Sequence, residues 1–248
     1  MSVWGKAAEV VTMIEAARQR GMDVTADAYP YLAWHSNLKV LVPNKQWTDP
    51  TSVKEALEDV GGGRNIQITR LPKFPTYVGR RLDEIARTEG VSEVDLYIRL
   101  VSDEDAGVIG HTMIEEDMRT FYRQPWVMVA SDGGLGMTHP RGAGTFPRVL
   151  GRFVRDEHWM TLPEAIRKMT SLPALRLGLK DRGVIRVGMK ADLVLFDPTS
   201  ILDMSTFERP RLRSRGIHAV FVNGVPVFGA ERPESPLPGR VLIRNSPR

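Results

Sequence analysis

The feature that most constrains this chain is an apolar run that ends abruptly in a carboxylate and two glycines. Residues 127–129 are Val, Met and Val, and β-branched residues suit a strand that is buried on both faces. Ser131, Asp132, Gly133 and Gly134 follow almost at once, and the glycines let the backbone turn sharply. In barrels that alternate strands with helices, catalytic groups lie at the carboxyl ends of the strands. The pattern therefore predicts an α/β protein with Asp132 at a functional edge of its sheet.

The segment near the N-terminus has the helix–strand alternation of an α/β fold. Apolar residues recur at helical spacing over residues 6–20, and Gly21 is a natural helix end. A short strand follows within residues 23–31, where Pro30 cannot continue a central ladder. Helix followed by strand is the rhythm of a barrel or of a doubly wound sheet.

Residues 32–107 interrupt this alternation with many prolines and glycines. Within them we expect a strand and three helices, with the strand over residues 65–70 and the helices over 51–59, 79–88 and 92–102. Two interpretations of the block stay open. It is either an insertion that lies over an active-site face or a plain surface subdomain.

The last part of the chain changes from helices to short strands. Helices are expected from Thr161 to Met169 and from Ser171 to Leu177. Strands are expected over residues 184–185, 191–196 and 218–228, and the last run contains Asn223-Gly224, a strong hairpin signal. We therefore divide the chain into an α/β part, residues 1–182, and a β-sandwich segment, residues 183–248.

Composition excludes several classes of protein. The 248 residues carry 34 basic and 30 acidic side chains, a net charge of +4, whereas nucleic-acid-binding proteins concentrate basic residues on one face. The absence of cysteine excludes disulfides and thiolate metal ligands and fits a cytoplasmic protein. No apolar run approaches the ~18 residues of a membrane-spanning helix, and the first residues lack a signal-peptide pattern. We therefore expect neither nucleic acid nor membrane as a partner.

Four segments, in order, resemble the N-acyl-D-amino-acid deacylase (D-aminoacylase) family of the metal-dependent amidohydrolase superfamily. They are DVTADAYPY at residues 23–31, SDG with HPR and GTFPRVLG at 131–151, AIRKMTSLPALRLGL at 165–179, and RGVIRVGMKADLVLFDP with VNG at 182–224. The resemblance implies the C-terminal part of an amidohydrolase (β/α) barrel, with an insertion at about 32–107, joined to a small β-sandwich built from both chain ends. Residues 22–28 and 126–132 resemble the last two barrel strands. A whole barrel takes about 250 residues. This chain of 248 spends 183–248 on the tail and about 32–107 on the insertion, so eight strand–helix units do not fit in the rest.

The resemblance also implies roles for residues in these motifs. Asp132 matches an aspartate near zinc that acts as general base on the attacking water. Arg141 matches the arginine that holds the substrate carboxylate, and Tyr29 matches a tyrosine that contacts the same carboxylate. His35 stands where the family often has a substrate-contacting serine, with Ser36 beside it, so either the contact shifts by one residue or the pocket differs. On the residues alone, a turn cap, a surface ion pair and core packing stay open for Asp132, Arg141 and Tyr29.

Zinc is the cofactor that the resemblance implies for the complete enzyme. The family's main ligands have no counterpart in this chain and would lie before Met1. The histidines are dispersed and lack HxH or HExxH spacing, at positions 35, 111, 139, 158 and 218. A makeshift site of His35, His139 and Asp132 is the alternative, because a catalytic zinc normally takes three protein ligands.

The activity implied is hydrolysis of a linear amide bond, which converts an N-acyl-D-amino acid into a D-amino acid and a carboxylate. We expect the chain to be inactive alone, with a small N-acyl amino acid as its substrate partner. A homo-oligomer and a complementing N-terminal half are the expected protein partners. The alternatives are a non-catalytic fragment or assembly module with exposed strand edges, and an amidohydrolase that acts on a cyclic amide.

Overall fold

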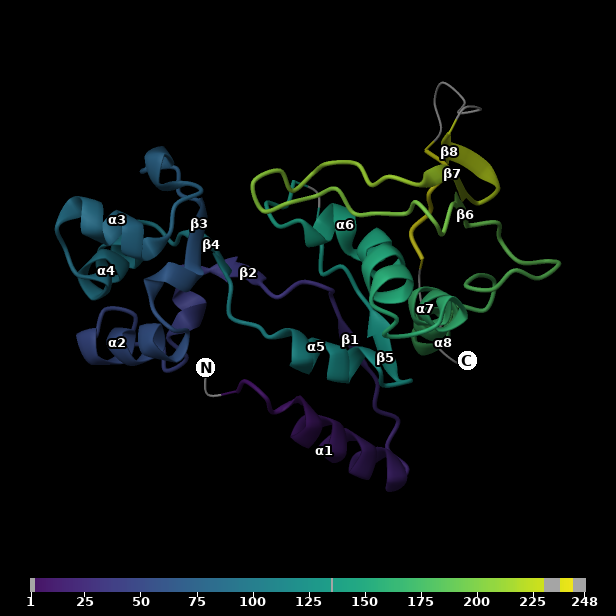
Figure 1. Ribbon diagram of the computed structural model, residues 1–248, viewed down its shortest axis with the longest axis horizontal. Coiled ribbons are helices and arrows are strands. Elements are labelled where there is room, and N and C mark those ends of the chain that lie inside the picture. The colour runs from purple at the N-terminus through teal and green to yellow at the C-terminus, as the bar shows by residue number, and fades with distance from the viewer. Residues whose placement is uncertain (1–2, 135, 230–236, 243–248) are drawn as a thin grey trace. The chain divides into compact units, whose positions relative to one another are not determined.

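The computed structural model shows an α/β chain with short sheets and separate helices (Figure 1). It describes residues 3–134, 136–229 and 237–242. Within those residues, no helix is both long and apolar enough to cross a membrane. The α/β class predicted from the sequence is confirmed, whereas the barrel portion and the sandwich segment remain predictions.

Two compact units make up the chain, and two of their boundaries fall inside helices α1 (Ala7–Gln19) and α5 (Glu115–Tyr122), while the third lies between Pro30 and Tyr31. The first unit holds a three-stranded sheet and comprises Met1–Val10 with Tyr31–Met118. The second unit holds a two-stranded and a three-stranded sheet and comprises Val11–Pro30 with Arg119–Arg248.

An antiparallel sheet in the order β2–β4–β3 forms the centre of the first unit. Its strands are β2 (Trp34–Asn37), β3 (Ile66–Arg70) and β4 (Gly107–Gly110). The central strand β4 is buried throughout, and its glycines let neighbours come close, because a Cβ on Gly110 would lie 2.1 Å from the Trp34 ring. The strand expected at 65–70 is confirmed, while β2 and β4 were missed.

Helices and this sheet share one apolar core. The helices are α2 (Pro50–Asp59), α3 (Leu82–Glu89) and α4 (Glu93–Asp103), with 3-10 turns η1 (Leu38–Leu41), η2 (Gly63–Asn65) and η3 (Pro75–Tyr77). The carboxylate of Asp49 caps α2 by accepting the Ser52 N–H at 2.8 Å, and the Ser92 hydroxyl caps α4 by accepting the Asp95 N–H at 3.0 Å. The three helices expected in this region are thus confirmed, with shifted ends.

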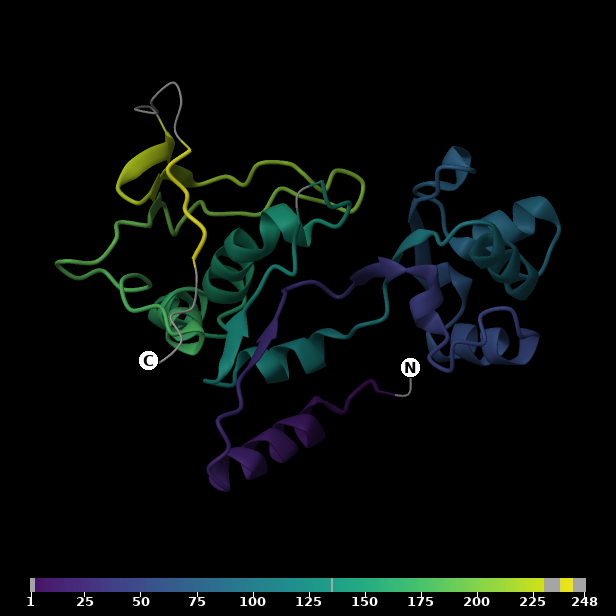
Figure 2. The same ribbon diagram turned by 180° about the vertical axis from the view of Figure 1, so that it is seen from behind.

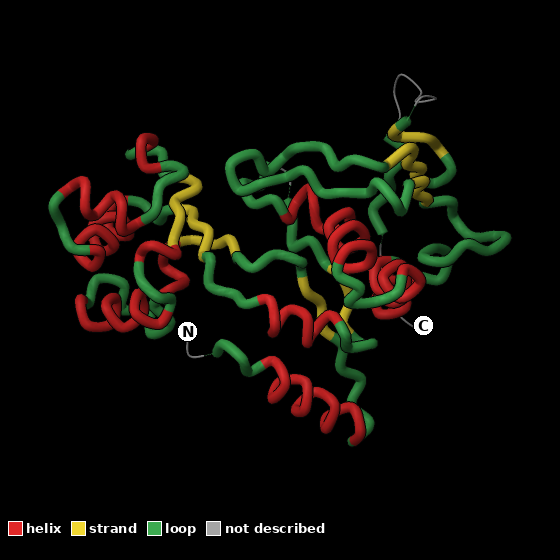
Figure 3. Tube along the Cα trace, viewed as in Figure 1, coloured by secondary structure: helices red, strands yellow, loops and turns green. Residues whose placement is uncertain are grey.

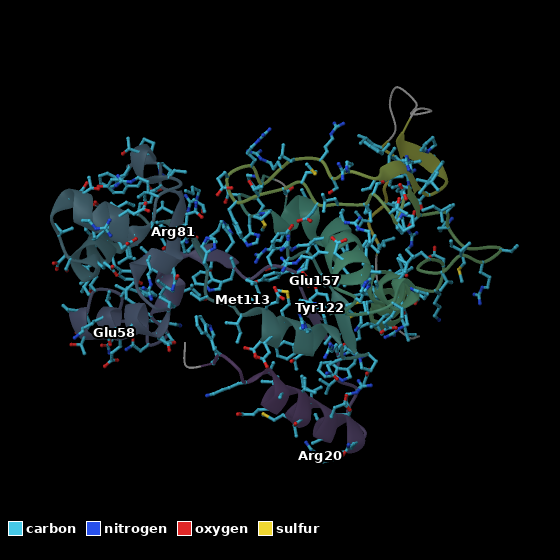
Figure 4. The ribbon with its side chains drawn as sticks, in the orientation of Figure 1. Arg20, Glu58, Arg81, Met113, Tyr122 and Glu157 are labelled. Carbon is cyan, nitrogen blue, oxygen red and sulfur yellow. The ribbon has the colours of Figure 1, made fainter. Side chains whose placement is uncertain are left out.

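The second unit contains a parallel pair of strands, β1 (Ala26–Ala28) and β5 (Val127–Val129). Ala26 lies opposite Val127 and Ala28 opposite Val129, so the carboxyl ends of both strands meet at one edge (Figure 2). The hydroxyl of Tyr122, labelled in Figure 4, donates to the Ala28 carbonyl at 2.9 Å and fastens the end of α5 to β1. This pairing therefore brings Tyr29 and the turn after β5 to the same edge.

The sequence analysis missed the long helical segment that follows this turn. Helix α6 (Arg141–Arg148) runs directly into a π-helical stretch, η4 (Val149–Asp156). Two glycines and Pro147 lie inside α6, and both residue types are poor helix formers. Pro147 offers no N–H to the carbonyl of Ala143, which instead accepts the Ser214 hydroxyl at 3.5 Å.

Helices α7 (Leu162–Met169) and α8 (Ser171–Leu177) follow, as predicted. The hydroxyl of Thr161 caps α7 by accepting the Glu164 N–H at 3.4 Å. The Lys168 side chain is 1% exposed, and its ammonium donates to the carbonyls of Gln124 and Val127, the latter at 3.0 Å. Lys168 therefore ties α7 to the start of β5.

The last sheet is antiparallel and consists of β6 (Leu193–Phe196), β7 (Ile217–Val222) and β8 (Val225–Phe228). The predicted hairpin is confirmed, with Asn223 and Gly224 at φ values of 49° and 81° in the turn. The strand predicted at 184–185 is wrong, because these residues lie in a loop where Ile185 is 91% exposed and no strand pairs with it (Figure 3).

A long excursion between β6 and β7, residues 202–215, is called the arm. Leu202 and Arg215 close it at its base by exchanging backbone N–H···O bonds of 3.2 and 2.9 Å. Its far part has no regular secondary structure (Figure 3). Asp203, 6% exposed at its side chain, pairs with Arg148 of α6 at 3.1 Å, so the arm is attached to that helix.

Candidate functional site

Asp132 lies in the turn that follows β5, as the sequence predicted. Its φ of 44° is in the left-handed region, which aspartate tolerates better than most residues. The turn is tight against the start of α6, because a Cβ on Gly133 would lie 2.8 Å from the Cα of Gly142. The carboxylate of Asp132 is 66% exposed and therefore accessible to water or a ligand.

Arg141, the first residue of α6, reaches back to this turn. Its side chain is 4% exposed, and its Nη2 lies 2.7 Å from Oδ2 of Asp132. Its Nε donates to the backbone carbonyl of Asp132 at 3.0 Å. A guanidinium has five N–H donors in a planar fork, so two serve Asp132 and the group can still bind a second acceptor. The surface-ion-pair alternative for Arg141 does not hold, because the arginine is buried.

Tyr29 comes directly after β1, and its ring packs against the guanidinium of Arg141. The guanidinium carbon of Arg141 lies 4.5 Å from the centre of the Tyr29 ring, a cation–π contact. Burial raises the pKa of Tyr29, with the charge of Arg141 opposing and that of Asp132 adding to the effect. The phenol is therefore protonated at neutral pH and can donate a hydrogen bond.

His139 completes the group, which we call the Arg141 cluster: Tyr29, Asp132, His139 and Arg141. Its ring is fully buried, and its Nδ1 accepts the backbone N–H of Arg141 at 3.1 Å. The ring meets Tyr29 edge-on at a centroid distance of 6.2 Å and Phe207 of the arm at 5.2 Å. The role of Phe207 was missed, since no local pattern links it to a residue so distant in sequence.

The backbone just beyond Tyr29 is held by a residue that the sequence analysis also missed. Nε of Arg148 donates to the Pro30 carbonyl at 2.7 Å while its Nη1 pairs with Asp203. In the sequence, Arg148 is singled out only as part of the GTFPRVLG motif. Nothing in that motif indicates that it binds the Pro30 carbonyl and Asp203. Arg148 thus joins the end of β1, helix α6 and the arm.

His35 and Ser36 lie on β2 in the first unit, whereas the Arg141 cluster lies in the second. Both side chains are half-buried, and Nε2 of His35 lies 3.4 Å from the Thr69 hydroxyl. Their role in substrate binding remains a prediction.

The residues present do not by themselves fit a zinc ion. Over residues 3–134, 136–229 and 237–242, no three or more His, Asp or Glu side chains are grouped so that they could hold a metal. Asp132 is engaged by Arg141, and Nδ1 of His139 is engaged by a backbone N–H. Asp132 and His139 thus both have partners within the second unit, and a makeshift site that adds His35 of the first unit remains a prediction.

Comparison with known proteins gives a consistent result. The sequence profile of the amidohydrolase family matches residues 6–228. D-aminoacylase from Alcaligenes xylosoxydans xylosoxydans is 40% identical over 248 residues, covering 98% of this chain and 46% of that protein. N-acyl-D-glutamate deacylase from the same organism is 38% identical over 245 residues, with coverage of 98% and 46%.

The solved structures agree with the sequence relatives. The crystal structure of N-acyl-D-glutamate deacylase from Bordetella bronchiseptica, complexed with zinc and a phosphonate mimic of the tetrahedral intermediate, matches with a TM-score of 0.83. It is 36% identical, and the match covers 98% of this chain and 47% of that one. The chain spans about half the length of the curated relatives it matches. Because the family profile extends over most of its residues, this protein belongs to the amidohydrolase family, and it is similar to D-aminoacylases along nearly its whole length.

Proposed function

We propose that the chain provides the substrate-carboxylate and proton-transfer part of a hydrolase that releases a D-amino acid from an N-acyl-D-amino acid. One observation carries this proposal: a buried arginine stacked on a tyrosine lies beside an exposed carboxylate at the end of two parallel strands. The similarity to deacylases of this class supports the same substrate.

Arg141 and Tyr29 are proposed to bind the carboxylate of the substrate. A guanidinium fork is complementary to a carboxylate, so the pair fixes orientation as well as position. The phenol of Tyr29, which stays protonated and lies against the same guanidinium, is proposed to add a hydrogen bond to this carboxylate. Burial of Arg141 strengthens its attraction for an anion, because less water competes for the guanidinium.

Asp132 is proposed to transfer the proton. Its carboxylate accepts a proton from the water that attacks the amide carbonyl, and it returns that proton to the nitrogen as the C–N bond breaks. In the structure this carboxylate is bound to Arg141, and the N–H donors of the guanidinium that do not serve Asp132 are left for the substrate carboxylate. Arg141 thereby holds the base and the substrate next to each other.

The described residues contain no group of three or more His, Asp or Glu side chains that could hold zinc. We propose that the ligands for zinc come from a further half of the protein, since the relatives are about twice as long as this chain. The arrangement proposed is the C-terminal part of a (β/α) barrel in residues 1–182, with an insertion at about 32–107, and a β-sandwich segment in 183–248. We also propose a cytoplasmic location.

The proposal is tested first by binding, because binding does not require the metal. Titration calorimetry of the 248-residue chain with N-acetyl-D-leucine should give saturable binding that Arg141→Lys weakens about tenfold or more, since lysine lacks the planar fork. Arg87→Lys is the matched control, because Arg87 is an exposed partner of Asp83 in the first unit. Equal binding by wild type and Arg141→Lys would rule out Arg141 as the carboxylate site.

A second measurement addresses turnover. Release of D-leucine is expected when the chain is combined with the N-terminal half of a related deacylase and zinc, and Asp132→Asn should abolish it. Turnover of a cyclic amide instead of the linear substrate would replace the proposed substrate class. Release of D-leucine by the chain alone would refute the need for a complementing half.

A further inference from the structure

His139 lies two residues before Arg141, the first residue of helix α6. Its imidazole supplies a hydrogen-bond acceptor to a backbone N–H of the first turn. The first four N–H groups of a helix have no partner within the helix. Here the N–H of Arg141 donates to Nδ1 of His139 at 3.1 Å, and the contact is buried. The N–H of Gly142 donates to the His139 carbonyl at 3.3 Å, so one residue satisfies two of these groups.

This bond determines the tautomer of the imidazole. A ring nitrogen that accepts a hydrogen bond carries no proton, so the neutral ring holds its proton on Nε2. A ring protonated on both nitrogens would oppose an N–H donor to the N–H of Arg141. The geometry therefore requires the neutral form of His139 for the backbone of Arg141 to keep its place.

Two aromatic rings contact the imidazole of His139. Tyr29 meets it edge-on at 6.2 Å with an interplanar angle of 65°, and Phe207 meets it at 5.2 Å with an angle of 84°. The carbonyl of Arg141 is held as well, because it accepts the Thr145 hydroxyl at 2.8 Å within buried surroundings. Both polar groups of the Arg141 backbone are thus held by side chains.

Phe207 owes its position to the arm, residues 202–215. The arm is closed by the Leu202–Arg215 bridge and attached to α6 through the Asp203–Arg148 pair at 3.1 Å and the Ser214–Ala143 bond at 3.5 Å. A rotation of the imidazole away from Arg141 would therefore have to displace Tyr29 or a ring on this attached segment.

We propose that His139 is a positioning residue: as a neutral imidazole in contact with Tyr29 and Phe207, it places the Arg141 guanidinium for carboxylate recognition. This inference rests on the proposed function only for the identity of the ligand. The bond between the two residues and its effect on Arg141 can be tested without any ligand.

The test compares two substitutions that separate hydrogen bonding from packing. Asn places Oδ1 at the position of Nδ1, so His139→Asn keeps an acceptor for the Arg141 N–H. Gln carries its oxygen one bond farther out, so His139→Gln keeps a polar side chain but displaces the acceptor. Phe207→Leu loosens the ring without touching either polar group.

The first readout is the side-chain Nε–H resonance of Arg141 in a ¹⁵N-correlated NMR spectrum, identified by its loss in Arg141→Lys. In wild type this proton is protected from exchange, because it is bonded to the Asp132 carbonyl at 3.0 Å in a buried side chain. We expect it to persist in His139→Asn, to broaden or vanish in His139→Gln and to broaden in Phe207→Leu. Unchanged backbone resonances from β6, β7 and β8 of the second unit would confirm that each variant is folded.

The second readout is the ratio of affinities for N-acetyl-D-leucine and its neutral amide. His139→Gln should lower this preference about tenfold, because a hydrogen bond to a charged group is worth roughly that factor, while His139→Asn should retain it. If His139→Gln keeps both the resonance and the preference, the proposal is wrong. If His139→Asn loses them as fully as His139→Gln, the ring acts by packing and the proposal is equally overturned. Lack of any preference in wild type would reject the proposed function, while the resonance would still decide the role of His139.

Discussion

Lys168 provides a prediction whose size can be worked out from the structure. Its ammonium is buried, with 1% of the side chain exposed, and this burial lowers its pKa to about 8, although Glu164 opposes the effect. In the unfolded chain the pKa returns to its ordinary value of 10.5. Burial of the charge therefore costs stability wherever the lysine is protonated in the folded state.

The sign and the size of the pH dependence follow from linkage. Between the two pKa values, pH 8 and 10.5, the unfolded state binds more protons, so the free energy of unfolding rises with pH. Stability changes by about 1.4 kcal/mol for each pH unit of this window, which gives about 3 kcal/mol in total. The bonds from Lys168 to the carbonyls of Gln124 and Val127 favour the ammonium, so this value is an upper limit.

Urea unfolding followed by circular dichroism at pH 7.5, 8.5 and 9.5 measures the effect. These values stay below the range in which Tyr29, whose pKa is raised, begins to lower stability. Wild type should gain about 1–2 kcal/mol relative to Lys168→Met between pH 7.5 and 9.5. Lys54→Met is the matched control, because Lys54 is 68% exposed and should leave the wild-type slope intact. An identical slope in wild type and Lys168→Met would refute the reasoning.

Two other substitutions test how the arm is attached to α6 and η4. Arg148→Met removes the cation that pairs with Asp203, whose side chain is 6% exposed, and should lower the free energy of unfolding by about 3–5 kcal/mol. The double variant Arg148→Met with Asp203→Leu should recover part of this loss, as measured by urea unfolding. Gly151→Ala would place a Cβ 2.5 Å from the Ile201 carbonyl and should lower the free energy of unfolding by about 1–3 kcal/mol. Gly134→Ala is the control, because a Cβ there would have nothing within 4 Å and should leave the same free energy nearly unchanged. A stable Gly151→Ala protein would show that Ile201, directly before the arm, can move away from η4.

Local patterns in the sequence predicted many of the elements. The apolar run at 127–129, the caps at Ser92 and Thr161 and the Asn223-Gly224 turn each act through groups a few residues apart, and each is observed. Such features depend on backbone geometry and nearby hydrogen bonds, so they can be read without the fold.

Helix α6 shows where this approach fails. Gly142, Gly144 and Pro147 disfavour a helix locally, yet the segment is helical because its buried residues pack into the second unit. Strand β4 is similar, since its two glycines weaken a strand signal but permit the close packing of Trp34. In both cases the gain from packing exceeds the loss in local propensity.

The sequence by itself determined the α/β class, the position of Asp132 after a buried strand and, through family resemblance, the candidacy of Arg141 and Tyr29. Only the tertiary structure decided that these three side chains meet and that Arg141 is buried and bound to Asp132. It also decided that Nδ1 of His139 accepts the backbone N–H of Arg141. Contacts between segments far apart in sequence form only when packing of the whole chain outweighs the conformational entropy lost on folding. A local sequence pattern contains no information on that sum, so it cannot predict which distant side chains meet.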